Sequence, residues 1–203
     1  MTHHLHRGDL PEGVSFGDTV AVDTEAMGLN PHRDRLCLVQ LSAGDGNAHL
    51  VQLMPGDYDA PRLKALMADP AVTKLFHFAR FDLGMIYQYL GVMAGPVYCT
   101  KIASRLARTF TDRHGLRDLC KDVLGVDLSK QQQSSDWGGA ALTDQQLHYA
   151  ATDVLHLHAL RAKLDAMLAR EGRADLARAA FDFLPARVLL DLEGWPEQDI
   201  FAH

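Results

Sequence analysis

The chain has 203 residues, of which 47% are hydrophobic and 23% charged, so it can form one globular domain with a proper core. Its formal net charge of −6 argues against the basic class of proteins that hold long nucleic acids through many phosphate contacts. Residues 99–130 nevertheless carry seven Lys and Arg against four Asp. This local excess fits either contacts to a short nucleic acid or a solvated helix face.

Neither a membrane segment nor a disulfide framework is indicated. No apolar run approaches the length of a bilayer span, and residues 1–7 lack the apolar core of a signal peptide. We interpret the histidines at positions 3, 4 and 6 as part of a frayed terminus. The three cysteines are far apart and form no C-x-x-C pair: Cys37, Cys99 and Cys120. We therefore expect a cytoplasmic protein with no membrane contact and no zinc site.

In chain order, the pattern predicts strands followed by helices. Alternating or continuous apolar runs predict strands at 20–25, 36–42, 49–53, 74–78 and 97–99. Helical periodicity with start and stop signals predicts helices at 60–68, 79–90, 100–109, 115–124, about 143–170 and roughly 173–182. The fold class is therefore α/β, with a mixed five-stranded central sheet flanked by helices. No linker separates a second domain, so we expect one domain over 1–203, with a core at about 15–170 and a helical tail at 171–203.

The strand at 20–25 ends in two carboxylates, Asp23 and Glu25. Side chains alternate along a strand, so these two point the same way. Neighbouring acids resist joint ionisation unless a cation lies between them, and hard cations such as Mg²⁺ prefer carboxylate oxygens. Such a pair is also common on a solvent-facing strand, so a metal role requires further residues.

Three more residues extend this pattern. Asp82 lies at the start of the predicted helix 79–90, and Tyr149 and Asp153 share one face of the long helix at i, i+4. Asp153 lies among apolar residues and needs a partner, because an unpaired buried charge is costly. Each acid alone also fits a structural role: a helix N-terminal charge for Asp82, or an ion pair with an arginine for Asp153.

Together, Asp23-x-Glu25, Asp82 and Tyr149-x-x-x-Asp153 resemble the three motifs of the DEDD exonuclease superfamily, tyrosine subtype. The chain also looks like the catalytic domain of ribonuclease D at residues 100–104, 130–137 and 149–155. Over nearly its whole length it most resembles the nano-RNase C family, small exoribonucleases of alphaproteobacteria that degrade the last short oligoribonucleotides, especially at residues 31–36, 130–137 and 199–203.

This resemblance implies a ribonuclease H-like fold and two-metal hydrolysis from the 3′ end, which releases nucleoside 5′-monophosphates. Four acids would hold two Mg²⁺ or Mn²⁺ ions roughly 3.5–4 Å apart: Asp23, Glu25, Asp82 and Asp153. Tyr149 would orient the attacking water. As the fifth motif residue, it completes the predicted catalytic set.

The resemblance also suggests residues that contact the substrate. Leu29 would wedge between the last two bases, and the alternative is a turn residue packed on the core. His77 would touch the 3′-terminal ribose, and the alternative is a satisfied core histidine. Lys130, Gln133 and Ser135 are candidates for the 5′ phosphate and the substrate backbone, because a length-selective enzyme needs donors at a fixed distance from the metals.

The C-terminal tail is unusually apolar, which indicates either an interface or packing on its own domain. The resemblance implies a ring-like homo-octamer, whose channel would restrict access to short RNA, above all dinucleotides. Three alternatives stay open: ribonuclease D-like trimming of longer or structured RNA, action on DNA ends, and a non-catalytic nucleic-acid-binding scaffold. No residue that we can name distinguishes RNA from DNA.

Overall fold

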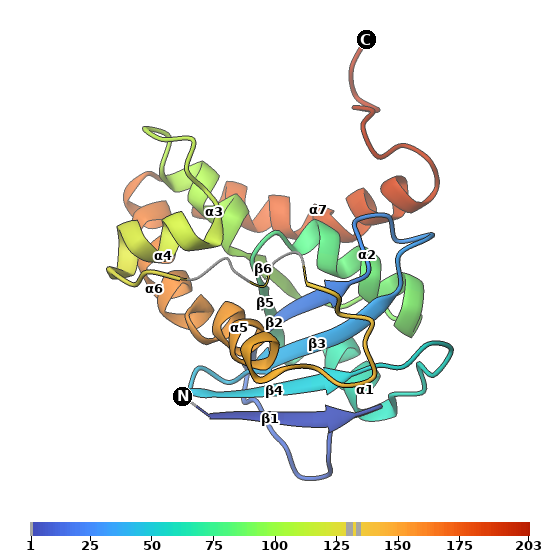
Figure 1. The fold of residues 1–203 in the computed structure, drawn as a ribbon. Helices are drawn as coiled ribbons and strands as arrows, with labels where there is room; N and C mark the ends of the chain where they lie inside the picture. Colours follow the sequence, from blue (N-terminus) through green and yellow to red (C-terminus); the bar gives the residue numbers. More distant parts are fainter. Residues whose placement is uncertain (1, 129–131, 133–134) are drawn as a thin grey trace.

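The computed structural model describes residues 2–128, 132 and 135–203, which form a sheet flanked by helices (Figure 1). The sheet has six strands in the order β1-β4-β3-β2-β5-β6. Their bounds are β1 Thr2–Arg7, β2 Thr19–Ala26, β3 Leu36–Ser42, β4 Asn47–Gln52, β5 Thr73–Phe76 and β6 Val97–Cys99. β2 pairs antiparallel with β3 and β3 with β4, while the β1–β4, β2–β5 and β5–β6 pairs are parallel. The mixed α/β sheet is thus confirmed.

The expected count of five strands and the frayed terminus were wrong, because β1 joins the sheet edge. It pairs in parallel with β4, with His4 opposite His49. The rings of His4 and His6 stack on His49, with centroids 5.1 and 5.2 Å away. The strand has no apolar alternation to reveal it in the sequence. Its pairing instead depends on backbone hydrogen bonds and ring contacts with a partner more than forty residues away.

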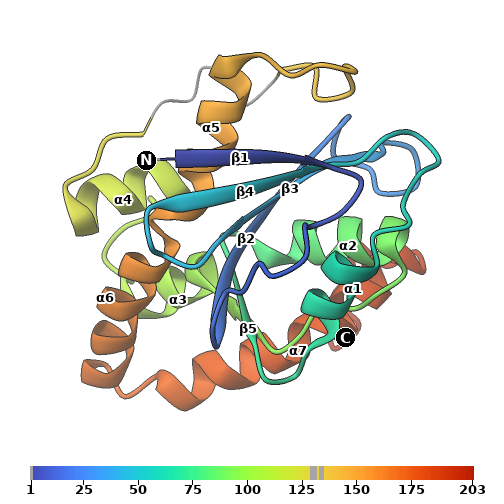
Figure 2. The ribbon, with the colours of Figure 1, turned by 90° about the horizontal axis from the view of Figure 1, so that it is seen from below.

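The helices are α1 Pro61–Ala68, α2 Ala79–Leu90, α3 Thr100–Ala107, α4 Leu116–Leu124, α5 Asp144–Leu155, α6 Leu157–Arg170 and α7 Ala174–Leu192. The single helix expected at 143–170 is therefore two, joined at His156. Helix α7 extends ten residues beyond the expected end at 182 and includes Pro185. Seen from below, α5 lies on one side of the sheet, with α1, α2 and α7 on the other (Figure 2). No helix in the described part of the chain is long and apolar enough to cross a membrane.

Local signals fix the elements that carry the predicted motif residues. All seven residues of β3 are buried, so the sheet centre is covered on both faces. Thr143 caps α5 as expected, and it forms a reciprocal capping box with Gln146. Helix α5 packs on β2, β3 and β4, while α2 follows β5 directly and packs on β2, β3, β5 and β6. As a result, the end of β2 lies between the first turn of α2 on one face and the C-terminal half of α5 on the other.

Candidate active site

Acidic side chains from three elements meet at the end of β2. Asp23 and Glu25 of β2 and Asp153 of α5 each offer a carboxylate oxygen, and these oxygens lie within 4.8 Å of one another. Asp82, in the first turn of α2, is only 2% exposed and lines the same cavity. The structure thus brings together all four acids that the sequence predicts.

The burial of these acids strongly disfavours their simultaneous ionisation. Burial raises the pKa of Asp23 to about 7. Burial, and then the charges of the other three acids, raises the pKa of Glu25 to about 10. The pKa values of Asp82 and Asp153 also lie well above the ordinary value, first through burial and then through the Asp23 charge. No ion pair joins these acids to a Lys or Arg in the described residues, so the cluster must hold either protons or added cations.

The donor set fits a hard divalent cation. It consists of carboxylate oxygens alone, without Cys or His, which is the chemistry that Mg²⁺ and Mn²⁺ select. Asp82 does lie in the first turn of α2, as its structural alternative expects, but that position alone does not explain the three other acids beside it. Asp153 has no arginine partner among the described residues; instead it accepts a hydrogen bond from the Tyr149 hydroxyl. Burial, followed by the Asp153 charge, raises the pKa of Tyr149, so its hydroxyl stays protonated.

Two residues that the sequence analysis missed hold the acids in place. Thr24 Oγ1 donates a 2.7 Å hydrogen bond to Asp82 Oδ1, and Gln40 Nε2 donates one of 3.2 Å to Asp23 Oδ2. Thr24 lies between the two acids Asp23 and Glu25, and nothing in the local sequence predicted a role for its hydroxyl. Gln40 could have been noticed in the sequence, because it is a polar side chain within the apolar run of β3.

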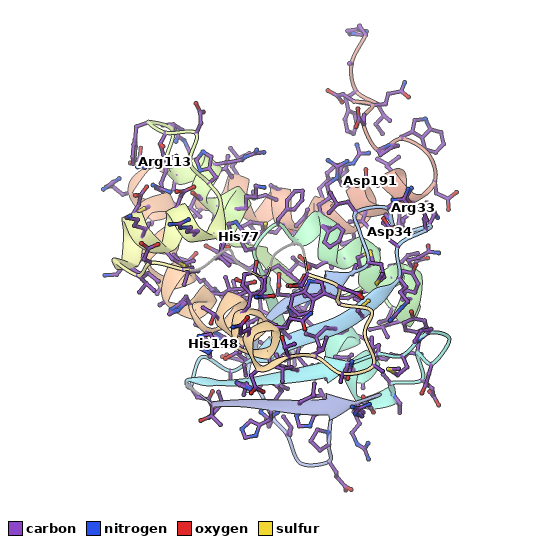
Figure 3. All side chains as sticks on the ribbon, viewed as in Figure 1. Arg33, Asp34, His77, Arg113, His148 and Asp191 are labelled. Atoms are coloured by element: carbon purple, nitrogen blue, oxygen red, sulfur yellow. The ribbon has the colours of Figure 1, made fainter. Side chains whose placement is uncertain are left out.

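A cavity of about 700 Å³ opens over the acids. Leu29 lines it and is 83% exposed, so the alternative of packing on the core is wrong. His77 also lines it; its Nδ1 lies 2.9 Å from Thr100 Oγ1, and burial lowers its pKa to about 3, which keeps the ring neutral. Figure 3 shows His77 near the centre of the molecule, whereas the exposed His148 lies on the outer side of α5.

The three candidates for phosphate binding are only partly placed. Ser135 lines the cavity, and its hydroxyl donates a 2.5 Å hydrogen bond to Gln132 Oε1. Lys130 and Gln133 lie outside the described residues. Two further residues of the cavity wall, Phe78 and Lys101, were not predicted as site residues. Lys101 Nζ lies 4.0 Å above the ring of Phe78, and its signals in the sequence were the excess of basic residues at 99–130 and the resemblance to ribonuclease D at 100–104.

The comparisons with known proteins agree with this geometry. The 3′-5′ exonuclease family matches residues 9–169. Ribonuclease D of Gluconacetobacter diazotrophicus is 36% identical over 156 residues, covering 77% of this chain and 39% of that protein. Ribonuclease D of Escherichia coli is 33% identical over 157 residues, covering 76% and 40%. The chain therefore spans about two fifths of the length of these curated relatives.

Solved structures add further matches, and those to NrnC extend over the whole chain. Brucella melitensis NrnC with bound Mg²⁺ is 53% identical, with a TM-score of 0.96 and complete coverage of both chains. The same protein bound to pGG is 54% identical, with a TM-score of 0.97 and coverage of 100% and 99%. Escherichia coli RNase D is 26% identical, with a TM-score of 0.74 and coverage of 89% and 48%. With its ribonuclease H-like fold, this chain belongs to the 3′-5′ exonuclease family, as a homologue of ribonuclease D and of NrnC.

Proposed function

We propose that this protein is a divalent-metal-dependent 3′-5′ exoribonuclease that hydrolyses short oligoribonucleotides, dinucleotides above all, to nucleoside 5′-monophosphates. The observation that carries the proposal is the cluster of four acids, Asp82 buried and the other three half-buried, beneath a cavity lined by an exposed leucine. The NrnC structures with Mg²⁺ and with pGG support both the metal and the short substrate.

Asp23, Glu25, Asp82 and Asp153 are the proposed ligands of two Mg²⁺ or Mn²⁺ ions. When bound, such ions neutralise the charge that develops on a phosphodiester during hydrolysis. The chain itself keeps the four acids on elements that are fixed by a sheet and two helices. It also shields them partly from water, which strengthens the electrostatic interactions in the site.

Tyr149 is the proposed residue that orients the attacking water. Its hydroxyl donates to Asp153, so its oxygen retains lone pairs that can accept a hydrogen bond from water. The raised pKa makes Tyr149 a poor base at neutral pH, which favours orientation over proton abstraction. Trp137, only 2% exposed, packs with its ring centroid 6.2 Å from that of Tyr149 and limits the movement of the phenol ring.

Leu29 and His77 are proposed to contact the substrate. A largely exposed leucine at the cavity rim suits insertion between two bases, because an apolar wedge selects stacking and not base identity. The neutral His77 ring suits a hydrogen bond to a ribose hydroxyl, since Thr100 engages its Nδ1. A cavity of about 700 Å³ has the size of a small-ligand pocket, which favours a short substrate over an extended strand. We propose Lys130, Gln133 and Ser135 for the 5′ phosphate.

We also propose that residues 1–203 act as one exonuclease domain that assembles into a homo-oligomer, an octamer by resemblance, in the cytoplasm. The support is a set of exposed apolar side chains on α7 and beyond it: Leu176, Phe183, Leu189, Trp195, Ile200 and Phe201. Light scattering coupled to size exclusion tests this assembly. A monomer at micromolar concentration would contradict it.

The function is tested by a length series of 5′-labelled RNAs from two residues upward, with Mn²⁺ and with chelator. We expect the dinucleotide to be cleaved fastest and the chelator to stop all cleavage. Asp23→Asn should abolish turnover and leave the circular dichroism spectrum unchanged. Equal rates at all lengths would instead support ribonuclease D-like trimming. Equal rates on RNA and DNA of the same length would add DNA to the substrate class. No release of monophosphates would support a non-catalytic scaffold.

A further inference from the structure

The carboxylates of the site approach β2 from both faces of the sheet. Asp23 and Glu25 point to the face covered by α5, where Asp153 meets them. Thr24, between them, points to the opposite face by strand alternation, and there its hydroxyl reaches Asp82 of α2. Both partners of this 2.7 Å hydrogen bond are buried, with exposed fractions of 5% for Thr24 and 2% for Asp82. The contact therefore links the α2 side of the site to the strand that carries the other acids.

A second hydrogen bond acts on the α5 face. Gln40 lies directly opposite Asp23 in the antiparallel β2–β3 pair, so both side chains point to the same side of the sheet. Its Nε2 donates to Asp23 Oδ2 at 3.2 Å, and the residue is fully buried. Gln40 Oε1 has no hydrogen-bond partner in the described part of the chain. What singles out Gln40 is that its one hydrogen bond is made to an acid of the cluster.

We infer that Thr24 and Gln40 are positioning residues that each hold one oxygen of a carboxylate, so that the other oxygen is free to bind a cation. Thr24 engages Oδ1 of Asp82, and Gln40 engages Oδ2 of Asp23. Both donors are neutral, so they orient the acids without competing as counter-ions. This inference rests on the proposed metal-dependent function. It adds that the orientation of two ligands is set by neutral donors on the two faces of the sheet, Thr24 of β2 and Gln40 of β3.

The test is direct binding of Mn²⁺, measured by isothermal titration calorimetry, together with kcat and KM for pGG. Thr24→Val removes the hydroxyl at nearly constant shape, and we expect metal affinity to fall by roughly 10- to 100-fold. Because the substrate contacts are unchanged, KM at saturating Mn²⁺ should stay within about twofold. Thr24→Ser restores the donor and should restore metal affinity. Gln40→Leu should also weaken metal binding, and it remains informative if Thr24→Val fails to fold.

Two buried side chains of the same sheet provide matched controls. Ser42 donates to the carbonyl of Asn47, and Gln52 donates to that of Gly139 while its Oε1, like that of Gln40, has no partner among the described residues. Ser42→Ala and Gln52→Leu should lower the melting temperature without changing Mn²⁺ affinity. Unchanged Mn²⁺ affinity in folded Thr24→Val and Gln40→Leu would overturn the inference. Failure of the proposed function would look different, because wild-type protein would then bind no Mn²⁺ or turn over without it.

Discussion

Raising the pH should tighten the binding of Mn²⁺ to the metal-free protein, because the cation competes with protons for the acid cluster. Burial and neighbouring charges raise the pKa of Glu25 to about 10, and burial raises that of Asp23 to about 7. At pH 8 the Asp23 carboxyl is therefore mostly ionised, whereas Glu25 keeps its proton in about 99% of molecules. A cation that uses the Glu25 carboxylate must displace that proton.

The size of the effect follows from the distance between the pH and the pKa. At pH 8 the pH lies two units below the Glu25 pKa, and at about 1.36 kcal/mol per unit this costs about 2.7 kcal/mol of binding free energy. The Glu25 proton alone should thus hold metal affinity at pH 8 about a hundredfold below its high-pH limit and should give a rise of about tenfold per pH unit up to pH 10. The raised pKa values of Asp82 and Asp153 should only steepen this rise. Below pH 7 the slope should steepen, because Asp23 then retains its proton as well.

Calorimetric titrations with Mn²⁺ at pH 7, 8 and 9 test this result. At each pH, two buffers of different ionisation enthalpy report how many protons are released, and we expect about one or more at pH 8. Glu25→Gln cannot release that proton, so its pH slope should fall by about one while its absolute affinity also drops. An affinity that stays constant from pH 7 to 9, with no proton release, would refute this account of the cluster.

Further predictions concern catalysis and stability. Tyr149→Phe should lower kcat by about 10²- to 10⁴-fold with little change in KM; a large rise in KM would assign the residue to substrate binding. Lys74→Met should lower the free energy of unfolding by about 3 kcal/mol in urea titrations, because the fully buried Nζ donates to three backbone carbonyls. Burial lowers the pKa of His49 and His6, so their contribution to stability is complete above pH 6.5 and is lost on acidification. His49→Phe should flatten the fall of the urea midpoint between pH 7 and 5, and an unchanged slope would contradict this.

The sequence by itself determined which acids and which tyrosine were candidates for one common site. Strand alternation placed Asp23 and Glu25 on one side of β2, and helical spacing placed Tyr149 one turn from Asp153. Both patterns are local, because backbone geometry alone relates residues that are two or four positions apart. For this reason most helix and strand bounds were also predictable. The exceptions are β1, which depends on a distant partner, the break between α5 and α6, and the C-terminal extension of α7.

Only the tertiary structure decided how these parts meet. Asp82 joins the cluster through Thr24 from the other face of the sheet, and Gln40 reaches Asp23 across a strand pair. The tertiary structure also places Leu29 in an exposed position at the cavity rim, although the sequence was equally compatible with a position in the core. These contacts join segments separated by up to 58 residues, and their geometry depends on how a helix packs on a sheet. No local pattern encodes that packing, since it results from the burial of many apolar side chains at once.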